Sequence, residues 1–334
     1  MNILFTCAGR RTYLLKYFKE QLGEEGKIVA TDLQLTAPAL SAADIKEQVP
    51  AVYAPDYIDC TLEICRRYDI KALISLNDLE LPILSENRWR FEKEDIKVLV
   101  SSPIVIDICF DKYRTSQFVE NIGLQSPKTY INFEKALKAV EAGELSFPIV
   151  LKPRWGSGSI GIEIVNNKIE LEETYRSLLS KIKKTILSTA SKGDEYILIQ
   201  QKINGQEYGL DVMNDLEGNN RGVSVKKKLS MRAGETDKAT TVDNEHIRNI
   251  GKILGENLKH IGNLDVDVLE EDGIFYVLEL NPRFGGGFPF SYEAGVNFPK
   301  AIIEWLKGKD IDTAILIPKY GMTFAKCDYL VNVD

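Results

Sequence analysis

The chain has 334 residues, of which 44% are hydrophobic and 27% charged, and its formal net charge is −7. This composition is typical of a globular protein with two or three domains, so it excludes a largely disordered chain, and the negative charge argues against a nucleic-acid partner. Five cysteines without a CxxC pair and only two histidines argue against a zinc site and a histidine-based triad, and they favour a reduced, cytoplasmic protein.

The chain begins with Met1 leading directly into an apolar strand, without a basic leader. We therefore expect no signal peptide, and no apolar run approaches the roughly 18 residues that cross a bilayer, so no membrane partner is expected either. Strands are predicted at 3–6, 27–31, 52–54, 72–76 and 98–101, and helices at about 11–21, 61–68 and 79–90. This alternation predicts a Rossmann-like parallel sheet with helices on both faces, in an α/β domain that spans residues 1–105.

Polar residues follow several of these strands, at the edge where ligands bind in parallel sheets. Arg10 follows the first strand, and Asp78 and Glu80 follow the fourth. Two interpretations stay open. These residues are solvated helix starts and helix caps, or Arg10 holds an anionic group of a substrate while Asp78 and Glu80 recognise an amine. The turn CAGRR after the first strand lacks the GxGxxG spacing of a dinucleotide-binding domain.

The next region combines lysines with a glycine-rich loop. Lys112 lies just inside a helix predicted at 111–121, and Lys152 ends a buried strand at 148–153. The loop that follows supplies backbone N–H groups and hydroxyls that suit phosphates, from Gly156, Ser157, Gly158, Ser159 and Gly161. Because the lysine precedes the loop, this is not a Walker A motif. We interpret the loop as a flap between strands that closes over phosphates, with an ordinary hairpin turn as the alternative.

A hinge between two lobes is predicted after the strand at 196–200. Its backbone would meet an adenine edge, with Ile203 against the ring and Glu207 near the ribose hydroxyls; the hinge residues are Gln200, Gln201, Lys202 and Ile203. A strand pair follows at 208–214 and 222–229. Strand alternation places Lys226 and Lys228 on one face, where Lys228 is the candidate for a nucleotide phosphate; a solvated face is the alternative.

Residues 231–242 are predicted to form a polar loop that is longer than a connection requires. Arg232 and Glu235 in this loop are candidates for contact with a substrate or a phosphate. A plain connection is the alternative.

The stretch Leu264–Gly287 predicts a β-hairpin with a turn at residues 271–273. Glu279 and Asn281 share one face of the second strand, and the turn brings Asp267 opposite them. These three oxygen donors suit Mg²⁺. Arg283 follows and is placed to bind a phosphate or carboxylate bidentately. The glycines at 285–287 let the chain pass close to a substrate.

Taken in order, Lys112, LKPRWGSGSIG, QQKINGQE and ELNPR resemble the ATP-grasp superfamily, over about residues 1–310. The resemblance is strongest to the carbamoyl-phosphate-synthase large-subunit type and to small single-site ligases such as the pyrrolysine-biosynthesis ligase. It implies an α+β ATP-grasp fold of two lobes, at 106–195 and 196–310, after the α/β domain and before a tail at 311–334. Two positions depart from the family pattern, because Gln200 stands where glutamate is frequent and Asp267 where many relatives have Glu or Gln.

The resemblance also implies roles for the residues named above. Lys112, Lys152 and the glycine loop would bind the phosphates of ATP, the hinge its adenine and Glu207 its ribose. Asp267, Glu279 and Asn281 would hold Mg²⁺, two ions by family resemblance, with Mn²⁺ as a substitute. Arg283, Lys152 and Arg232 are the candidates for catalysis.

The implied reaction is an ATP-dependent carboxylate–amine ligation through an acyl phosphate, with release of ADP and phosphate. The expected partners are a small carboxylic acid and an amine, amino acids among them, in a protein that forms a homodimer. Two alternatives stay open: an enzyme that phosphorylates bicarbonate or carbamate, and a nucleotide-binding protein without turnover. The second would bind ATP but release no ADP with any substrate.

Overall fold

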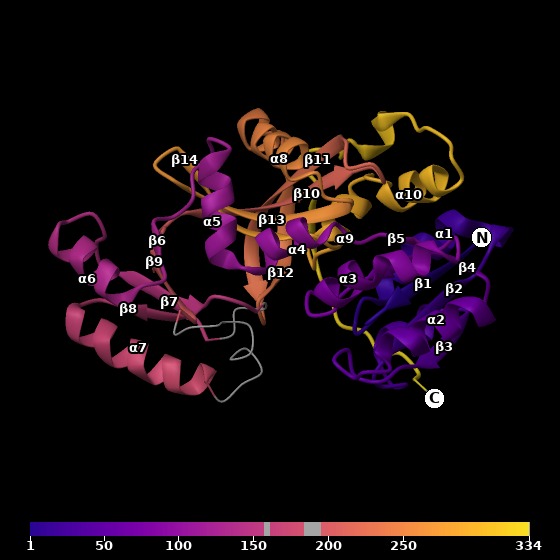
Figure 1. Ribbon diagram of the computed structural model, residues 1–334. Coiled ribbons are helices and arrows are strands. Elements are labelled where there is room, and N and C mark those ends of the chain that lie inside the picture. The colour runs from indigo at the N-terminus through magenta and orange to yellow at the C-terminus, as the bar shows by residue number, and fades with distance from the viewer. Residues whose placement is uncertain (157–160, 184–194, 334) are drawn as a thin grey trace.

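The computed structural model describes residues 1–156, 161–183 and 195–333. Within these residues three β-sheets lie next to one another across the molecule, with a six-stranded sheet between a five-stranded and a four-stranded one (Figure 1). No helix in the described part is long and apolar enough to pass through a membrane.

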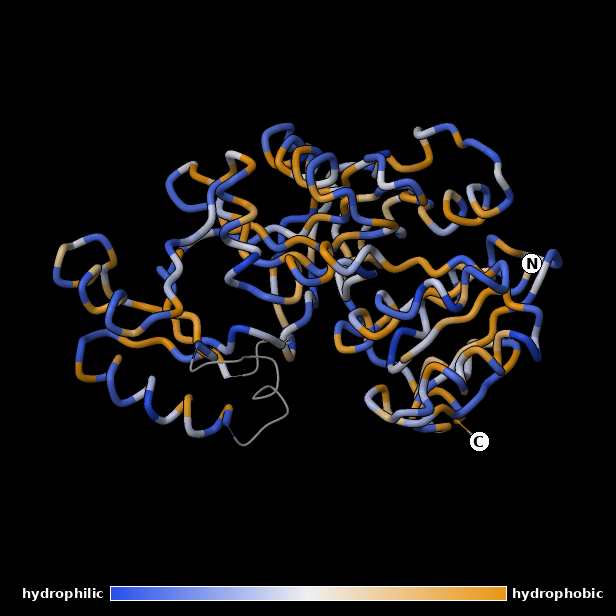
Figure 2. The backbone as a smooth tube through the Cα atoms, viewed as in Figure 1, coloured by the Kyte–Doolittle hydropathy of each residue, from blue (hydrophilic) through white to orange (hydrophobic). Residues whose placement is uncertain are grey.

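The five-stranded sheet is parallel, in the order β3-β2-β1-β4-β5, which confirms the predicted N-terminal parallel sheet. Its strands are β1 (Asn2–Thr6), β2 (Ile28–Asp32), β3 (Ile45–Gln48), β4 (Ile70–Ser75) and β5 (Lys97–Val98). The helices around it are α1 (Thr12–Leu22), α2 (Tyr57–Arg67) and α3 (Leu81–Glu92). Figure 2 shows these strands as hydrophobic runs between more polar helices.

Successive residues of β1 enter different cores, because a parallel strand is covered on both faces. Ile3 and Phe5 pack with α1 and with the late helix α10 (Phe298–Leu306), whereas Leu4 packs with α2 and α3. The C-terminal part of the chain thus returns to cover the first sheet.

The strand predicted at 52–54 is wrong, because these residues form turns. The third strand is β3, whose sequence IKEQ is half exposed at the edge of the sheet. A short polar edge strand buries too little to produce an apolar run, so its pattern gave no signal.

The four-stranded sheet has the order β6-β9-β7-β8 and supports the glycine-rich loop. Its strands are β6 (Thr129–Tyr130), β7 (Ile149–Pro153), β8 (Glu163–Val165) and β9 (Ile197–Gln201), and its helices are α6 (Phe133–Glu141) and α7 (Lys168–Ile182). Two helices lead into it from the first domain, α4 (Pro103–Phe110) and α5 (Lys112–Asn121).

The six-stranded sheet is antiparallel, in the order β14-β13-β10-β11-β12-β15. Its elements are β10 (Gln206–Asn214), β11 (Asn220–Arg232), β12 (Glu235–Thr241), α8 (Glu245–Leu258), β13 (Gly262–Glu271), β14 (Ile274–Asn281), α9 (Phe288–Glu293) and β15 (Thr323–Ala325). One face is apolar and packs against α8, α4 and α5. The other face carries charged side chains, which is unusual for a covered sheet surface and marks the site described next.

The polar loop predicted at 231–242 is wrong, because these residues form the tip and second strand of the β11–β12 hairpin. Ala233 and Gly234 make the turn with φ values of 50° and 79°. The strand ETDKATT is polar because it lies near the sheet edge, where β15 from the tail pairs with residues 238–240.

Candidate functional site

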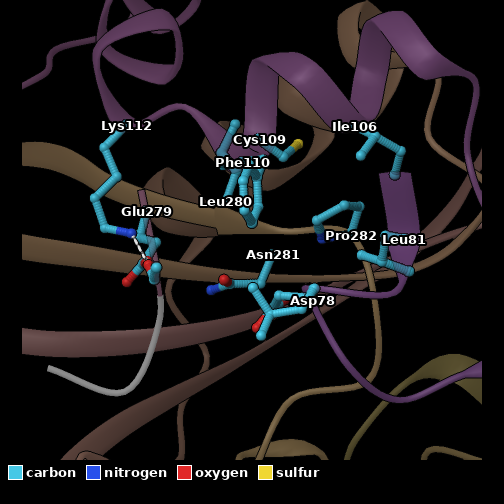
Figure 3. A pocket seen from close by; sticks show the side chains of 12 residues that line it. Asp78, Leu81, Ile106, Cys109, Phe110, Lys112, Glu279, Leu280, Asn281 and Pro282 are labelled. Atoms are coloured by element: carbon cyan, nitrogen blue, oxygen red, sulfur yellow. Dashed lines mark hydrogen bonds and ion pairs between the residues drawn. The ribbon is translucent and has the colours of Figure 1, made fainter. Parts of the chain in front are cut away.

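A cleft of about 340 Å³ opens between the ends of β1 and β4 and the polar face of the six-stranded sheet. The N-terminal domain contributes Gly9, Arg11 and Asp78 to its lining, and the β11–β12 hairpin contributes Glu235. A smaller cavity of about 20 Å³ adjoins it. Figure 3 shows this cavity, with Asp78 beside Asn281 and the apolar side chains of α4 above them.

The β13–β14 hairpin places the predicted metal ligands on the cleft. Asp267 pairs directly with Glu279 across the two strands, and Asn281 pairs with Asp265. The register is set by the turn, where Asp272 and Gly273 have φ values of 52° and 78°, as a two-residue hairpin loop requires. Oxygen atoms from both strands therefore meet at one end of the hairpin.

Each of the two predicted metal carboxylates is paired with a lysine. The Lys112 ammonium lies 2.8 Å from a Glu279 oxygen, as the dashed line in Figure 3 marks, and Lys228 lies 2.6 Å from Asp267 and 2.7 Å from Glu207. Burial alone would raise the pKa of Glu279, but Lys112 and Lys152 hold it below its usual range. Burial alone would lower the pKa of Lys228, but Asp267 and Glu207 raise it. Positive and negative side chains thus alternate in this cluster, and a bound ion could replace one partner of a pair.

The donor set at the hairpin fits a hard cation, because carboxylate and amide oxygens are the ligands that Mg²⁺ prefers. In the described part of the chain, no three His, Cys, Asp or Glu side chains converge closely enough to form a metal site by themselves. A cation held here would therefore need Asn281 and oxygen atoms of a substrate to complete its coordination.

Lys152, at the end of β7, is buried, with 6% of its surface exposed, and has no ion-pair partner in the ranges that the structure describes. Burial lowers its pKa to about 8, with Lys112 adding to the effect and Glu279 opposing it. A buried, unpaired ammonium is costly unless an anion joins it. The predicted contact of Lys152 with a phosphate of ATP would supply such an anion and stays a prediction.

The glycine loop is framed by two described residues. Lys112 donates a hydrogen bond to the Gly156 carbonyl, and Gly161 has a φ of 74°. The predicted contacts of Ser157, Gly158 and Ser159 with phosphates fall outside the described residues and stay predictions.

The hinge residues lie between the small sheet and the six-stranded sheet, at the end of β9 and before β10. Gln200 is buried and donates to the Thr129 hydroxyl at 2.8 Å, and the Gln201 carboxamide accepts a bond from the Lys128 amide. Ile203 is buried, and Lys202 donates to Asn204. These side chains do not line the 340 Å³ cleft. Their role toward adenine stays a prediction.

Arg283 joins the N-terminal domain to the β13–β14 hairpin. Its guanidinium nitrogens lie 2.9 Å from an Asp78 oxygen and 3.1 Å from an Asp265 oxygen. Burial alone would raise the pKa of Asp78, but Arg283 lowers it, as expected for a carboxylate beside a guanidinium. A side chain at Gly285 would collide with Asp265, because its Cβ would lie 2.1 Å from the carboxylate carbon. Only glycine therefore allows this arrangement.

Three predicted substrate or catalytic residues do not reach the cleft. Glu80 is fully buried and accepts hydrogen bonds from Thr6, Ser75 and Tyr57, so it supports the turn after β4 instead of facing an amine. Arg10 is exposed. Arg232 is also exposed and pairs with Asp237 and with Asp328 of the tail, which places it on the outer surface of the hairpin.

Two residues that line the cleft were missed by sequence reasoning. Asp265 precedes Asp267 by two positions on the same strand, so alternation alone could have placed both on one face. Arg11 lines the cleft where Arg10 was expected. No pattern in the sequence distinguishes the two neighbouring arginines, since both lie in the turn before α1.

Comparison with known proteins decides the family. Residues 109–287 match the family model described as ATP-grasp domain, and residues 3–99 match the PylC-like N-terminal domain. The chain belongs to the ATP-grasp family. Its predicted fold, a parallel-sheet domain followed by the ATP-grasp fold, is thereby confirmed.

Curated relatives of this ATP-grasp chain include two carbamoyl phosphate synthase large chains. The one from Xanthomonas axonopodis pv. citri (strain 306) is 26% identical over 251 residues, which cover 69% of this chain and 22% of the relative. The arginine-specific one from Bacillus subtilis (strain 168) is 23% identical over 238 residues, covering 67% and 22%. The chain thus matches about a fifth of the length of these relatives.

Solved structures share the fold at lower identity. The biotin carboxylase from Campylobacter jejuni superposes with a TM-score of 0.72 at 21% identity, covering 93% of this chain and 72% of that one. The L-amino acid ligase from Bacillus licheniformis gives a TM-score of 0.73 at 19% identity, covering 96% and 79%. These likenesses show that the ATP-grasp architecture extends over nearly the whole chain.

Proposed function

We propose that this ATP-grasp chain is an ATP-dependent ligase that joins a small carboxylic acid to an amine through an acyl phosphate. A carboxylate oxygen of the acid attacks the γ-phosphorus of ATP, the bond from that phosphorus to the ADP oxygen breaks, and ADP leaves. The amine nitrogen then attacks the acyl carbon, phosphate departs, and the nitrogen loses a proton. The observation that carries the proposal is the buried Lys152, which has no ion-pair partner among the described residues, together with the Lys112–Glu279 and Lys228–Asp267 pairs.

The chain's own residues supply positioning and charge, which dominate phosphoryl transfer. Lys152 and Lys112 bind phosphate oxygens, and Lys112 leaves Glu279 free when it does so. Asp267, Glu279 and Asn281 would hold Mg²⁺, which would supply positive charge to the transferring phosphate. Two ions, with Mn²⁺ as a substitute, follow from the family resemblance. The predicted role of the glycine loop, exclusion of water from the reactive acyl phosphate, depends on residues 157–160, which lie outside the described residues.

The substrates enter the cleft between the N-terminal domain and the β13–β14 hairpin. Amino acids are the class to test first, since the L-amino acid ligase from Bacillus licheniformis shares the fold. Arg283, which lines the cleft, is our candidate for contact with the acid where it would meet the γ-phosphate. We also propose that the chain works as a homodimer, and measurement of its mass in solution tests this.

The test is a screen for ADP release with paired carboxylic acids and amines, amino acids included. The proposal requires release that depends on both members of a pair and on Mg²⁺. Glu279→Ala is the control, because it removes a metal ligand and should abolish turnover. Full activity in this variant would contradict the metal assignment, and ATP binding without release for any pair would favour a protein without turnover.

A second candidate is an enzyme that phosphorylates bicarbonate or carbamate. The observation that favours it is the match to carbamoyl phosphate synthase large chains. ADP release that depends on bicarbonate alone, with no organic acid present, would select this reaction over the ligation.

A further inference from the structure

Two arginines line the 340 Å³ cleft, and they differ in how their charge is met. Arg283 is paired with two carboxylates, Asp78 and Asp265. Arg11 makes no ion pair with any carboxylate that the structure describes, although it is half-buried. Its Nε atom is buried and has no hydrogen-bond partner among the described residues, which is also true of the Arg283 Nε, so the two arginines differ in their ion pairs. A buried N–H group without an acceptor is costly, and a bound anion would supply that acceptor.

Arg11 is held firmly in this position. One of its terminal nitrogens donates to the Leu76 carbonyl at the end of β4, and its guanidinium also contacts the Tyr13 hydroxyl. The turn that carries it is fixed, because the Gly9 amide donates to the Asp32 carboxylate at 2.9 Å and the Arg11 amide donates to the Ala8 carbonyl. A charged donor that is ordered before binding loses little entropy when an anion arrives.

Helix α1 begins at this point and adds to the positive field. Arg11 is its N-cap residue, the side chain makes no capping bond, and the first turn contains no acidic residue. The free N–H groups at the start of an 11-residue helix favour negative charge.

Among the described residues that line the cleft, Arg11 is the cation without a direct ion pair to a carboxylate, although its charge lowers the pKa of Asp78 and of Glu235 from beyond ion-pair distance. Glu279, Asp267 and Glu235 each have a lysine partner, in Lys112, Lys228 and Lys326. Asp78 and Asp265 share Arg283. An anion that enters the cleft at its N-terminal side therefore meets Arg11 without displacing an ion pair to any carboxylate that the structure describes.

We propose that Arg11 and the first turn of α1 bind a carboxylate of the substrate that the reaction does not consume. One substrate of the ligase therefore carries a spare carboxylate, as a dicarboxylic acid or an amino acid does. The bidentate geometry of a guanidinium suits this group. The inference rests on the proposed function for the identity of the ligand as a substrate, whereas the anion site itself stands on the contacts of Arg11.

The first experiment measures the anion site without turnover. Malonate binding to the full chain is followed by calorimetry with Mg²⁺·ADP present, so that the phosphate-binding lysines are occupied. Arg11→Gln should weaken binding about tenfold or more, the effect of a lost charge-assisted bond, whereas Arg10→Gln should change it less than about twofold. Equal binding by the wild type and Arg11→Gln would overturn the proposal, as would the absence of saturable malonate binding to the wild type.

The second experiment uses an acid–amine pair that releases ADP. Arg11→Gln should raise the KM of the substrate with the spare carboxylate about tenfold or more, while kcat and the KM for ATP stay within about threefold. The amide analogue of that substrate should be equally poor with both proteins. Arg11→Lys, which keeps the charge, should recover part of the affinity and shows that folding is intact.

These two experiments separate the two proposals. If no pair releases ADP but malonate binding depends on Arg11, the ligase assignment fails and the anion site stands. If a pair is active but Arg11→Gln leaves the KM of both substrates unchanged, the anion site fails and the ligase assignment stands.

Discussion

Two lysine–aspartate pairs lie next to one another on the polar face of the six-stranded sheet, and only one of them opens on the cleft. Lys226 pairs with Asp211, and both side chains are almost fully buried, with 1% and 0% of their surface exposed. Lys228, two residues further along β11, pairs with Asp267, and these side chains are 7% and 21% exposed. Both lysines flank Gly209, so they share one face of the sheet.

The difference lies in what covers each pair. Ser291 of α9 accepts from Lys226 and donates to Asp211, and Asn263 donates to the other Asp211 oxygen, so this pair is sealed and fully hydrogen-bonded. Lys228, by contrast, lines the cleft together with Asp267. The same type of ion pair can therefore have two roles. The Lys226–Asp211 pair, covered by α9, stabilises the fold, whereas the Lys228–Asp267 pair lines the cleft, where a ligand could replace one partner.

The largest expected effect concerns the sealed pair. Lys226→Met should lower the free energy of unfolding by about 3–5 kcal/mol, because Asp211 would stay buried without its counter-charge. Lys228→Met is the matched control and should cost less than half as much, since Asp267 and Glu207 reach the cleft. Denaturant unfolding measures both, and equal losses would remove the distinction between the two pairs.

Asp267→Asn should lower the rate of ADP release about 10²–10³-fold, the usual cost of losing a charge-stabilising group. Its stability at pH 8 should be unchanged or higher. Burial raises the pKa of Asp267 to about 7 in the folded protein, above its unfolded value, so the ionised carboxylate costs stability above that pH and asparagine removes the cost.

Asp211→Asn is the comparison for this prediction, since it alters the sealed pair. It should lower the thermal midpoint and leave the rate per folded molecule nearly unchanged. A similar loss of rate in both variants would show that the sealed pair also serves the reaction.

Lys152 extends the comparison to pH, because it differs from Lys226 and Lys228 in having no carboxylate partner among the described residues. The pKa of Lys152 is about 8, so the ammonium is charged at pH 7 and largely neutral at pH 9. Affinity for ATP should therefore fall about tenfold between these pH values, as a single titrating cation predicts. Lys152→Arg should remove this dependence because arginine stays charged. Calorimetry across the pH range measures it, and an unchanged slope in Lys152→Arg would assign the dependence to another group.

The smallest effect is expected at the outer surface of the β11–β12 hairpin. Arg232 is exposed and paired with Asp237 and Asp328, and exposed pairs contribute about 0–1 kcal/mol. Arg232→Gln should therefore change stability by less than about 1 kcal/mol and turnover by less than about threefold. Measurement of kcat in a supplied acid–amine pair tests this, and a loss of 10²-fold or more would restore the catalytic role suggested by the sequence.

The sequence by itself determined the elements that depend on local periodicity and on residue order. The alternating strands and helices predicted the parallel sheet, and the hairpin with Asp267, Glu279 and Asn281 followed from strand alternation and a turn at Asp272 and Gly273. The order of the lysines, glycines and acidic residues along the chain indicated the family, because each of them lies on a strand, helix or loop whose place in the chain order can be read from the sequence.

Only the tertiary structure decided which polar residues serve the cleft. Arg11 lines it while Arg10 is exposed and does not. Glu80 is buried and hydrogen-bonded to three side chains, and the segment 231–242 pairs as a strand once a neighbouring edge is available. Strand alternation predicted that Lys226 and Lys228 lie on one face of the sheet. Which of the two lines the cleft could be decided only from the structure, where α9 covers Lys226. Burial and exposure of a charge depend on segments distant in sequence, so the residues around a polar side chain in the sequence do not reveal what covers it.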